Sequence, residues 1–257
     1  MAVIYYANPP SPCSFTRRGL VAAANDIPYS VKLVNQSADP WTFFSYQQVS
    51  NEQSANLLSL VWICSPFQIV PKADITFQWS IDYNFVWGAC GNVQPGVTFS
   101  AGEAIPADPQ SGNNTIFSTL PGPNLSAAAP GSPQGSLAIT DASTVPNNTF
   151  LVGIGMGGAG TIVTLAGPNL RHTFTTSPTY WIAAGVNIEV GTILDITTVA
   201  QNLQVNFPVN VYDITCVLGA DNQGHKARSN QAPSSGTRRS GSKGRSVGDG
   251  CLPRVRV

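Results

Sequence analysis

The sequence predicts an all-β protein, an antiparallel β-sandwich of jelly-roll-like or barrel-like type with at most one or two short helices. Two observations predict this class. Charged residues make up 10% of the 257 residues, against about a quarter in typical globular proteins, whereas helix surfaces normally carry Glu, Lys, Arg and Ala. In addition, many short apolar segments are separated by turn residues, with no long helical segments between them, which is typical of sandwiches and barrels.

The clearest predicted strand covers residues 77–87. Every second residue of FQWSIDYNFVW is apolar or aromatic, and the residues between them are mostly polar. This period of two places six large side chains on one face of a sheet. We expect that face to be buried between two stacked sheets.

The other strands follow from the same alternation and from the Gly- and Pro-containing turns between them. We expect strands at 29–35, 41–48, 57–63, 135–140, 149–156, 161–166, 179–184, 192–198 and 210–218. Ser50 and Gln53 form a capping box that predicts a short helix from Asn51. The segments 100–114 and 121–134 are predicted to be long loops, which in a compact β domain carry function or are mobile.

The zero net charge hides two oppositely charged parts. Up to Gln223 the chain has five basic and twelve acidic residues, a charge of −7, and from Gly224 it has eight basic and one acidic residue, a charge of +7. We predict a poorly structured extension (1–28), a single β-sandwich domain (29–222) and a basic, disordered tail (223–257). The alternative for the tail is an artefact of the gene model.

Cysteine usage and hydropathy predict a cytoplasmic protein. The five cysteines form no CxxC pair, and free buried thiols are typical of a reducing compartment. The apolar run at the N-terminus is too short for a signal peptide, and no stretch reaches the roughly 18 apolar residues of a membrane span. The basic tail could bind nucleic acid or an anionic membrane, whereas the folded domain is not expected to bind nucleic acid. N-glycosylation sequons occur at Asn35, Asn113, Asn124 and Asn147.

Two features of the sequence bear on cofactor or metal chemistry. Residues 155–160 (GMGGAG) match the GxGxxG dinucleotide motif, which needs a helix after it, but TIVTLAG follows and predicts a strand. We therefore interpret the glycines as a hairpin turn or bulge. His172 is the one histidine before residue 224, and no ligand or nucleophile is spaced to work with it. The sequence predicts no cofactor and no metal site.

Carboxylates and aromatic side chains remain as candidates for function. The residues that could supply acid/base groups or hydrogen-bond donors are Asp82, Asp108, Tyr83 and Tyr180. Asp82 stands out because it faces away from the aromatic row of the predicted strand. The residues that could bind a ligand are Trp79, Trp87, Trp181 and Glu103, because aromatic rings form stacking platforms for sugars and apolar rings. Core packing or simple solvent exposure is the ordinary alternative for each.

Seven segments resemble those of the RhiA-like family, rhizosphere-expressed RhiA-type proteins of bacteria and fungi. They are LVNQS (33–37), FQWSIDYNFVWG (77–88), QPGVTFSA (94–101), PADP (106–109), LVGIGMGG (151–158), PTYWIAAG (178–185) and FPVNVYDITCVLGADN (207–222). The resemblance spans about residues 29–222. It implies a link to small-molecule biology, but no catalytic residues are established for the family, so it transfers no role to any position.

Two functions from different classes fit these observations. The first is a non-catalytic β-sandwich that binds a small apolar or glycan ligand, or a protein partner, through its long loops. The alternative is a cofactor-independent enzyme of cyclase or isomerase type in a secondary-metabolite pathway, since shape and desolvation can accelerate such reactions. An enclosed pocket with a carboxylate or tyrosine hydroxyl among tryptophans favours the enzyme, whereas a filled core with a shallow loop-lined groove favours binding.

Overall fold

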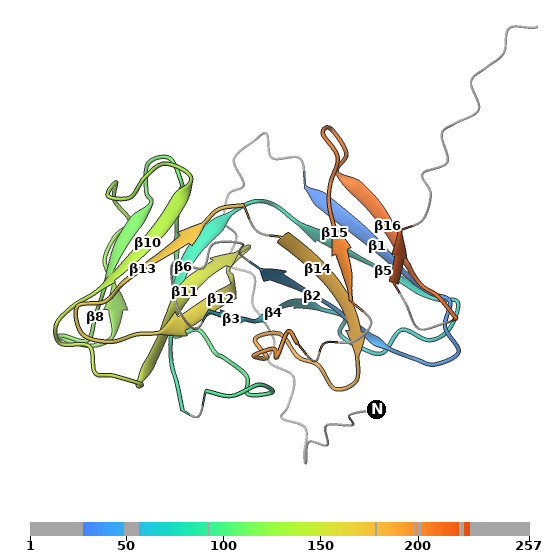
Figure 1. Cartoon of the computed structure of the whole chain (residues 1–257), viewed down its shortest axis with the longest axis horizontal. Coiled ribbons are helices and arrows are strands. Elements are labelled where there is room, and N and C mark those ends of the chain that lie inside the picture. Colours follow the sequence, from blue (N-terminus) through green and yellow to red (C-terminus); the bar gives the residue numbers. More distant parts are fainter. Residues whose placement is uncertain are drawn as a thin grey trace, which may run out of the picture. The chain divides into compact units, whose positions relative to one another are not determined.

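The structure is a computed structural model that describes residues 28–48, 57–91, 93–177, 179–197, 199, 202–220 and 224–226. Every regular element within these ranges is a β-strand (Figure 1). The predicted all-β class is therefore confirmed, and the sheets in the described ranges are open sheets rather than a closed barrel. The short helix expected from Asn51 lies outside the described residues.

Two four-stranded sheets face each other and form what we call the first sandwich. One has the order β17-β16-β1-β5, with bounds β1 (Tyr29–Asn35), β5 (Asp74–Trp79), β16 (Asp213–Leu218) and β17 (Gly224–Lys226). The other has the order β15-β14-β2-β4, with bounds β2 (Thr42–Gln48), β4 (Val61–Cys64), β14 (Thr179–Gly185) and β15 (Leu203–Val205). Both sheets contribute to one core, which includes Val31, Leu33, Phe43, Trp62, Phe77 and Ile182.

A five-stranded and a four-stranded sheet form the second sandwich. The larger sheet has the order β3-β12-β11-β6-β7, with bounds β3 (Leu58–Ser59), β6 (Tyr83–Ala89), β7 (Glu103–Pro106), β11 (Phe150–Met156) and β12 (Ala159–Leu165). The smaller has the order β13-β10-β8-β9, with bounds β8 (Asn114–Ser118), β9 (Asn124–Leu125), β10 (Ser136–Asp141) and β13 (Arg171–Thr175). Their shared core includes Phe85, Phe117, Leu137, Ile139, Val152 and Phe174.

Between β1 and β17 the chain passes from one sandwich to the other four times, the first time between β2 and β3. In the other three cases β3 leads into β4, β5 into β6, and β13 into β14. The crossing between β3 and β4 is at Leu60, which is fully buried and donates its N–H to the Thr161 carbonyl at 2.9 Å. Met156, at the end of β11, packs into the core of the first sandwich. The two sandwiches are therefore joined by covalent crossings and by shared packing, and a residue near the joint can be held from both sides.

The predicted strand at 77–87 is wrong as a single element. β5 ends at Trp79 and β6 begins at Tyr83, and the two strands belong to different sandwiches. Phe77 is buried in the first core and Phe85 in the second, whereas Ile81 between them is 44% exposed. An alternating pattern indicates that every second side chain is buried, but it does not indicate which sheet buries it.

Short strands account for most of the other differences. β7 and β9 lie inside the two segments predicted to be loops, and β17 lies within the segment predicted to be a tail. The strand predicted at 192–198 is absent, because Thr192 and Ile193 form isolated bridges to Thr98 and Leu60 instead of a ladder. Such two- to four-residue pairings depend on backbone hydrogen bonds, which leave little trace in the side-chain pattern.

The glycine-rich segment forms the hairpin turn and bulge that the sequence predicts. Gly157 and Gly158 connect β11 to β12 with φ values of 62° and 83°, as a type I′ turn requires. The ladder shifts register between Ile154 and Gly155, which is the bulge. A strand, and not a helix, follows the glycines, so the segment lacks the helix that a dinucleotide site needs.

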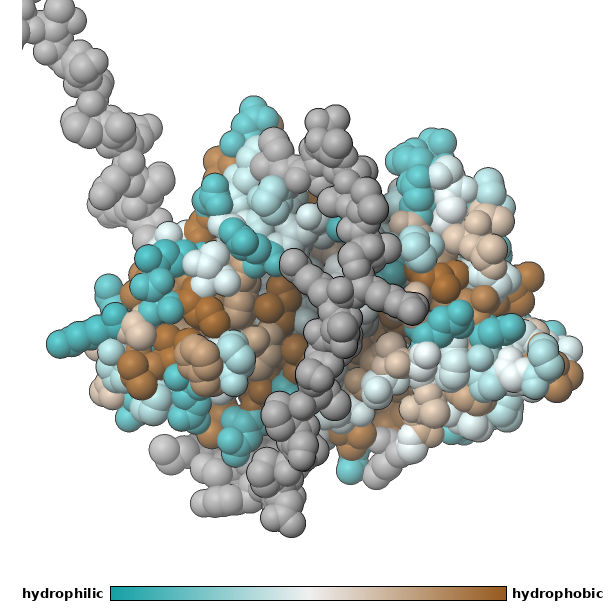
Figure 2. Space-filling model, turned by 180° about the vertical axis from the view of Figure 1, so that it is seen from behind, coloured by the Kyte–Doolittle hydropathy of each residue, from teal (hydrophilic) through white to brown (hydrophobic). Residues whose placement is uncertain are grey.

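The surface seen in Figure 2 carries apolar side chains in several groups with polar residues between them. The most exposed of the large apolar side chains in the described ranges are Phe67, Leu120 and Val209, which lie on three separate connections. Within the same ranges, no helix is long and apolar enough to cross a membrane.

Candidate functional site

An open pocket of about 360 Å³ lies where the two sandwiches meet. One wall comes from the β15-β14-β2-β4 sheet and the other from β3 and β12. The described lining residues are Gln48, Leu57, Ser59, Ile162, Thr179, Trp181, Ile196 and Gln204. We call this the junction pocket. A second void, lined by residues of the first sandwich, measures only about 20 Å³.

The β14 sequence places Trp181 in the junction pocket by simple alternation. Tyr180 and Ile182 point into the first core, so Trp181 between them must point to the opposite face of the sheet. There it lies across from Tyr46 on β2 and Gln204 on β15. The Trp181 and Tyr46 rings are nearly parallel, at 11°, with centroids 6.2 Å apart. The indole N–H of Trp181 is buried and has no hydrogen-bond partner, so this wall contains an unsatisfied donor.

No ionisable side chain is found among the described residues that line the junction pocket. Its polar groups are the amides of Gln48 and Gln204 and the hydroxyls of Ser59 and Thr179. The Ser59 hydroxyl donates to the Gln47 carbonyl at 2.8 Å, which leaves its oxygen free to accept. The pocket therefore combines an aromatic ring, aliphatic side chains and neutral hydrogen-bonding groups.

The other predicted ligand-binding residues lie away from the junction pocket. Trp79 is buried in the first core, where the centroid of its ring lies 5.3 Å from that of the Trp62 ring. Trp87 donates its indole N–H to Glu103 at 2.9 Å, and the same carboxylate oxygen accepts the Leu125 N–H at 2.9 Å. Glu103 thus holds three strands together, and both residues have structural roles within the second sandwich.

Tyr83 and Tyr180 are brought together around Met156. Tyr83 pairs with Met156 across the β6–β11 ladder, and the Tyr180 hydroxyl lies 3.9 Å from the Met156 sulfur. The Tyr83 hydroxyl donates to the Thr176 carbonyl at 2.5 Å. Burial raises the pKa of both phenols, that of Tyr180 to about 12. Neither lines the junction pocket.

The two aspartates predicted as acid/base groups are exposed and lie outside the named strands. Asp82 lies between β5 and β6, where its backbone carbonyl accepts the Gly157 N–H at 2.9 Å. The Asp108 carboxylate accepts the Ser111 hydroxyl and the Gln110 N–H, and these hydrogen bonds lower its pKa. The four predicted acid/base residues therefore do not form one site.

The buried phenols predict a loss of stability at alkaline pH. Burial raises the pKa values of Tyr46, Tyr83 and Tyr180 above the ordinary value of 10.0. Between about pH 10 and pH 12 the unfolded chain therefore loses protons that the folded chain keeps. Burial also raises the pKa of the Cys64 thiol above its ordinary value of 9.0, so urea titrations should give a free energy of unfolding that begins to fall above about pH 9 and falls further above about pH 10. Tyr180→Phe should flatten that fall, and an unchanged free energy through the same range would contradict the burial of these hydroxyls.

The two long segments predicted to bind a ligand are tied to each other. The Asn113 side-chain oxygen accepts the N–H groups of Gly131 and Ser132, each at 3.1 Å, and its amide donates to the Ser132 carbonyl at 2.8 Å. Asn113 is 2% exposed, and Asn35 is fully buried with its amide donating to two carbonyls. These two sequons are therefore part of the folded interior, whereas those at Asn124 and Asn147 are exposed.

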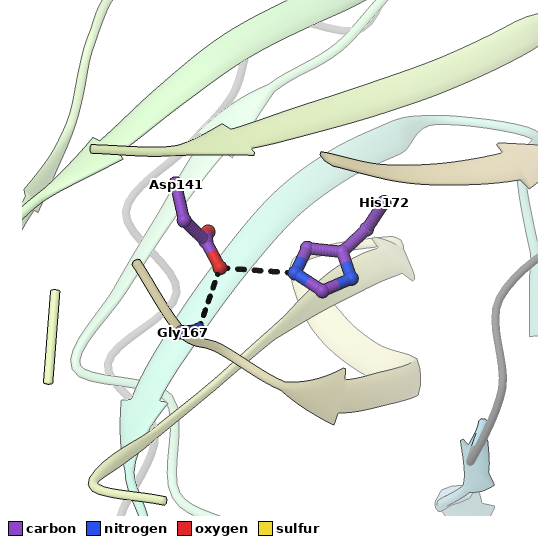
Figure 3. A network of polar contacts seen from close by, with 3 residues as sticks. All are labelled: Asp141, Gly167 and His172. Carbon is purple, nitrogen blue, oxygen red and sulfur yellow. Dashed lines mark hydrogen bonds and ion pairs between the residues drawn. The ribbon is translucent and has the colours of Figure 1, made fainter. Parts of the chain in front are cut away.

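A buried Asp141–His172 pair is the feature that sequence reasoning missed. Figure 3 shows the Asp141 carboxylate between the His172 ring and the Gly167 backbone, with distances of 3.0 Å and 2.9 Å from one oxygen to the two nitrogens. The Asp141 side chain is 0% exposed and that of His172 8%. The available signal was position: Asp141 continues the buried row of Leu137 and Ile139 on β10, where an apolar residue is expected.

This pair has the geometry of an orienting carboxylate on an imidazole. Within the described residues, no serine, threonine or cysteine is hydrogen-bonded to His172, and no three potential metal ligands gather anywhere. The pair instead connects the end of β10, the start of β13 and the loop at Gly167. We assign it a structural role.

Most of this chain is similar in sequence to known proteins. The family model described as RhiA matches residues 26–227, a range that includes every described residue. Protein RhiA of Rhizobium leguminosarum bv. viciae is 48% identical over 204 residues, which cover 79% of this chain and 88% of that protein. No solved structure matches the chain. The matched range is far more than half of the sequence, and the chain therefore belongs to the RhiA family.

Proposed function

We propose that this chain is a small-molecule-binding protein whose ligand occupies the junction pocket. The observation that carries the proposal is the pocket itself, an open volume of about 360 Å³ with Trp181 in its wall. Ligand sites in proteins are typically about 300–1,000 Å³, are lined by aromatic and aliphatic groups with a few polar ones, and favour the junctions between structural units. The junction pocket has each of these properties.

The position of the pocket supports preorganised binding. Gln48, Thr179, Trp181 and Gln204 stand on three neighbouring strands of one sheet, and Ser59 and Ile162 form a cross-strand pair of the other sheet. Strand pairing fixes the backbone that carries these side chains, so ligand binding does not have to order it. The exposed Gln204 side chain still loses rotamer freedom when it contacts a ligand.

The alternative of a cofactor-independent enzyme has less support. Such an enzyme needs an acid, a base or a hydroxyl within reach of the bound molecule. Asp82 and Asp108 are exposed and lie between strands, while Tyr83 and Tyr180 lie at the edge of the core around Met156. None of the four is among the described pocket residues. The described lining of the pocket comes mainly from strands and includes no residue of the long segments 100–114 and 121–134, which were predicted to bind the ligand. Its neutral lining still supports binding more than catalysis.

Replacing Trp181 with alanine is expected to weaken ligand binding by about 10- to 100-fold. Burying an aromatic side chain against a ligand contributes about 1.5–3 kcal/mol, and each 1.4 kcal/mol changes the dissociation constant about tenfold. Ligand-observed NMR on the full chain, with a library of sugars and small apolar rings, identifies a binder, and calorimetry then compares the variants. Phe67→Ala removes an aromatic ring that is 67% exposed and outside the pocket, so it serves as the matched control. Equal affinity for Trp181→Ala and the wild type would exclude this site.

A further inference from the structure

We infer that the ligand of the junction pocket is a neutral sugar ring, and this inference rests on the proposed function. The proposed function allows either an apolar ligand or a glycan, and the inference restricts the ligand to neutral sugars. Three properties of the pocket support it: the charge of the wall, the division of the wall into polar and apolar groups, and the spacing of those groups along the sheet.

The wall disfavours charged ligands. Its described residues carry no carboxylate, ammonium, guanidinium or imidazole group. A carboxylate or ammonium moved from water into such a site loses hydration without gaining a counter-charge, and that loss costs several kcal/mol when burial is substantial. A neutral molecule avoids this penalty.

The wall also disfavours pure hydrocarbons. An apolar ligand that filled the pocket would cover the amides of Gln48 and Gln204 and the hydroxyls of Ser59 and Thr179, and each polar group left unpaired costs about 1–3 kcal/mol. The Gln204 amide donates one hydrogen bond to Asn206, at 3.2 Å, and keeps its oxygen and its second N–H for other partners. A ligand that carries several hydroxyl groups satisfies such mixed donors and acceptors.

The spacing of these groups fits a six-membered ring. Thr179 pairs with Gln48, and Trp181 pairs with Gln204, on the same face of the sheet and two residues apart along β14. Two residues of a strand span about 6.6–6.8 Å, and neighbouring strands are about 4.8 Å apart. The distance between the Trp181 ring and the neighbouring amide and hydroxyl groups is therefore about the width of one pyranose. A pyranose can stack its C–H face on an aromatic ring, while the hydroxyls at its edge reach the polar groups.

Pairs of pyranoses with the same ring, one neutral and one carrying a charged group, test the inference on the full chain. Glucose is compared with glucuronate, and N-acetylglucosamine with glucosamine, and cyclohexanol serves as an apolar ring of similar size. We expect at least one of the neutral sugars to bind and its charged counterpart to bind at least tenfold more weakly. Gln204→Leu should weaken sugar binding and strengthen cyclohexanol binding. Gln78→Leu is the control, because Gln78 is an exposed strand glutamine outside the pocket.

The outcomes separate the inference from the proposed function. A charged sugar that binds as well as its neutral counterpart, or cyclohexanol binding without any sugar binding, overturns the sugar assignment. The proposed function survives either result if Trp181→Ala abolishes that binding. If none of the sugars or apolar rings binds, both the assignment and the proposed function fail.

Discussion

Gly153→Ala is expected to destabilise the protein by at least about 4 kcal/mol, enough to prevent most of the chain from folding. Gly153 lies in the middle of β11, between Val86 on β6 and Val163 on β12. A Cβ atom there would lie 2.0 Å from the Ile162 carbonyl oxygen and 2.7 Å from the Val163 Cα. Both are backbone atoms of the β12 ladder. They cannot move aside without breaking hydrogen bonds, so the cost exceeds the usual 1–3 kcal/mol of an overpacked side chain.

Gly112→Ala is the matched control for this prediction. The nearest atom to a Cβ at Gly112 is 3.5 Å away, which is ordinary van der Waals contact, and its φ is not left-handed. Its effect should therefore stay within about 0.5 kcal/mol. Soluble yield and urea unfolding followed by tryptophan fluorescence measure both variants. If the two alanine variants unfold at the same urea concentration, the close approach of β11 and β12 is wrong.

Asp141→Ala is expected to lower the free energy of unfolding by about 3 kcal/mol. The substitution removes the acceptor of the Gly167 N–H and of the His172 ring, and leaves both partners in a buried site. Each donor left unpaired in the interior costs about 1–3 kcal/mol. For a domain of about 200 residues, this loss corresponds to a melting temperature about 6–12 °C lower.

Two further variants distinguish the loss of the hydrogen bonds to Asp141 from the loss of a negative charge. Asp141→Asn keeps one acceptor oxygen and the side-chain shape, so we expect a loss between that of alanine and zero. Asp82→Ala removes an exposed carboxylate and should change the melting temperature by less than about 2 °C. Differential scanning calorimetry of the three variants provides the comparison. A melting temperature for Asp141→Ala as high as that for Asp82→Ala would contradict the structural role of the pair.

The longer strands could be predicted because their signal is local. β1 occupies the predicted residues, and β2, β11 and β14 differ from prediction by one residue at an end. In each, neighbouring side chains alternate between two environments, and this alternation can be read within one segment. The hairpin at Gly157 could be predicted for the same reason. Its two turn residues have positive φ values, which favour glycine.

The pairing of strands could not be predicted in the same way. β1 pairs in parallel with β16, so that Ser30 lies beside Asp213, and nothing within either segment identifies the other as its partner. The break between Trp79 and Tyr83 has the same origin, because it depends on which sheets cover the two halves. β15, three residues long, supplies Gln204 to the pocket and was not predicted.

The candidate site could also be predicted only in part. Trp181 was among the four side chains proposed for ligand binding, and it lines the junction pocket, but Trp79, Trp87 and Glu103 do not. Asp141 was absent from the candidates because nothing within its own segment identifies its partners His172 and Gly167, which lie 31 and 26 residues further along the chain.

The all-β class, the longer strands, the glycine hairpin and the scarcity of catalytic motifs follow from the sequence alone, because each depends on residue types and on spacings within one short segment. The two-sandwich arrangement, the junction pocket and the buried Asp141–His172 pair were decided by tertiary structure. Each of these brings together side chains from strands that are distant in the chain, and the free energy that selects such contacts comes from burial and hydrogen bonds formed only when the sheets meet.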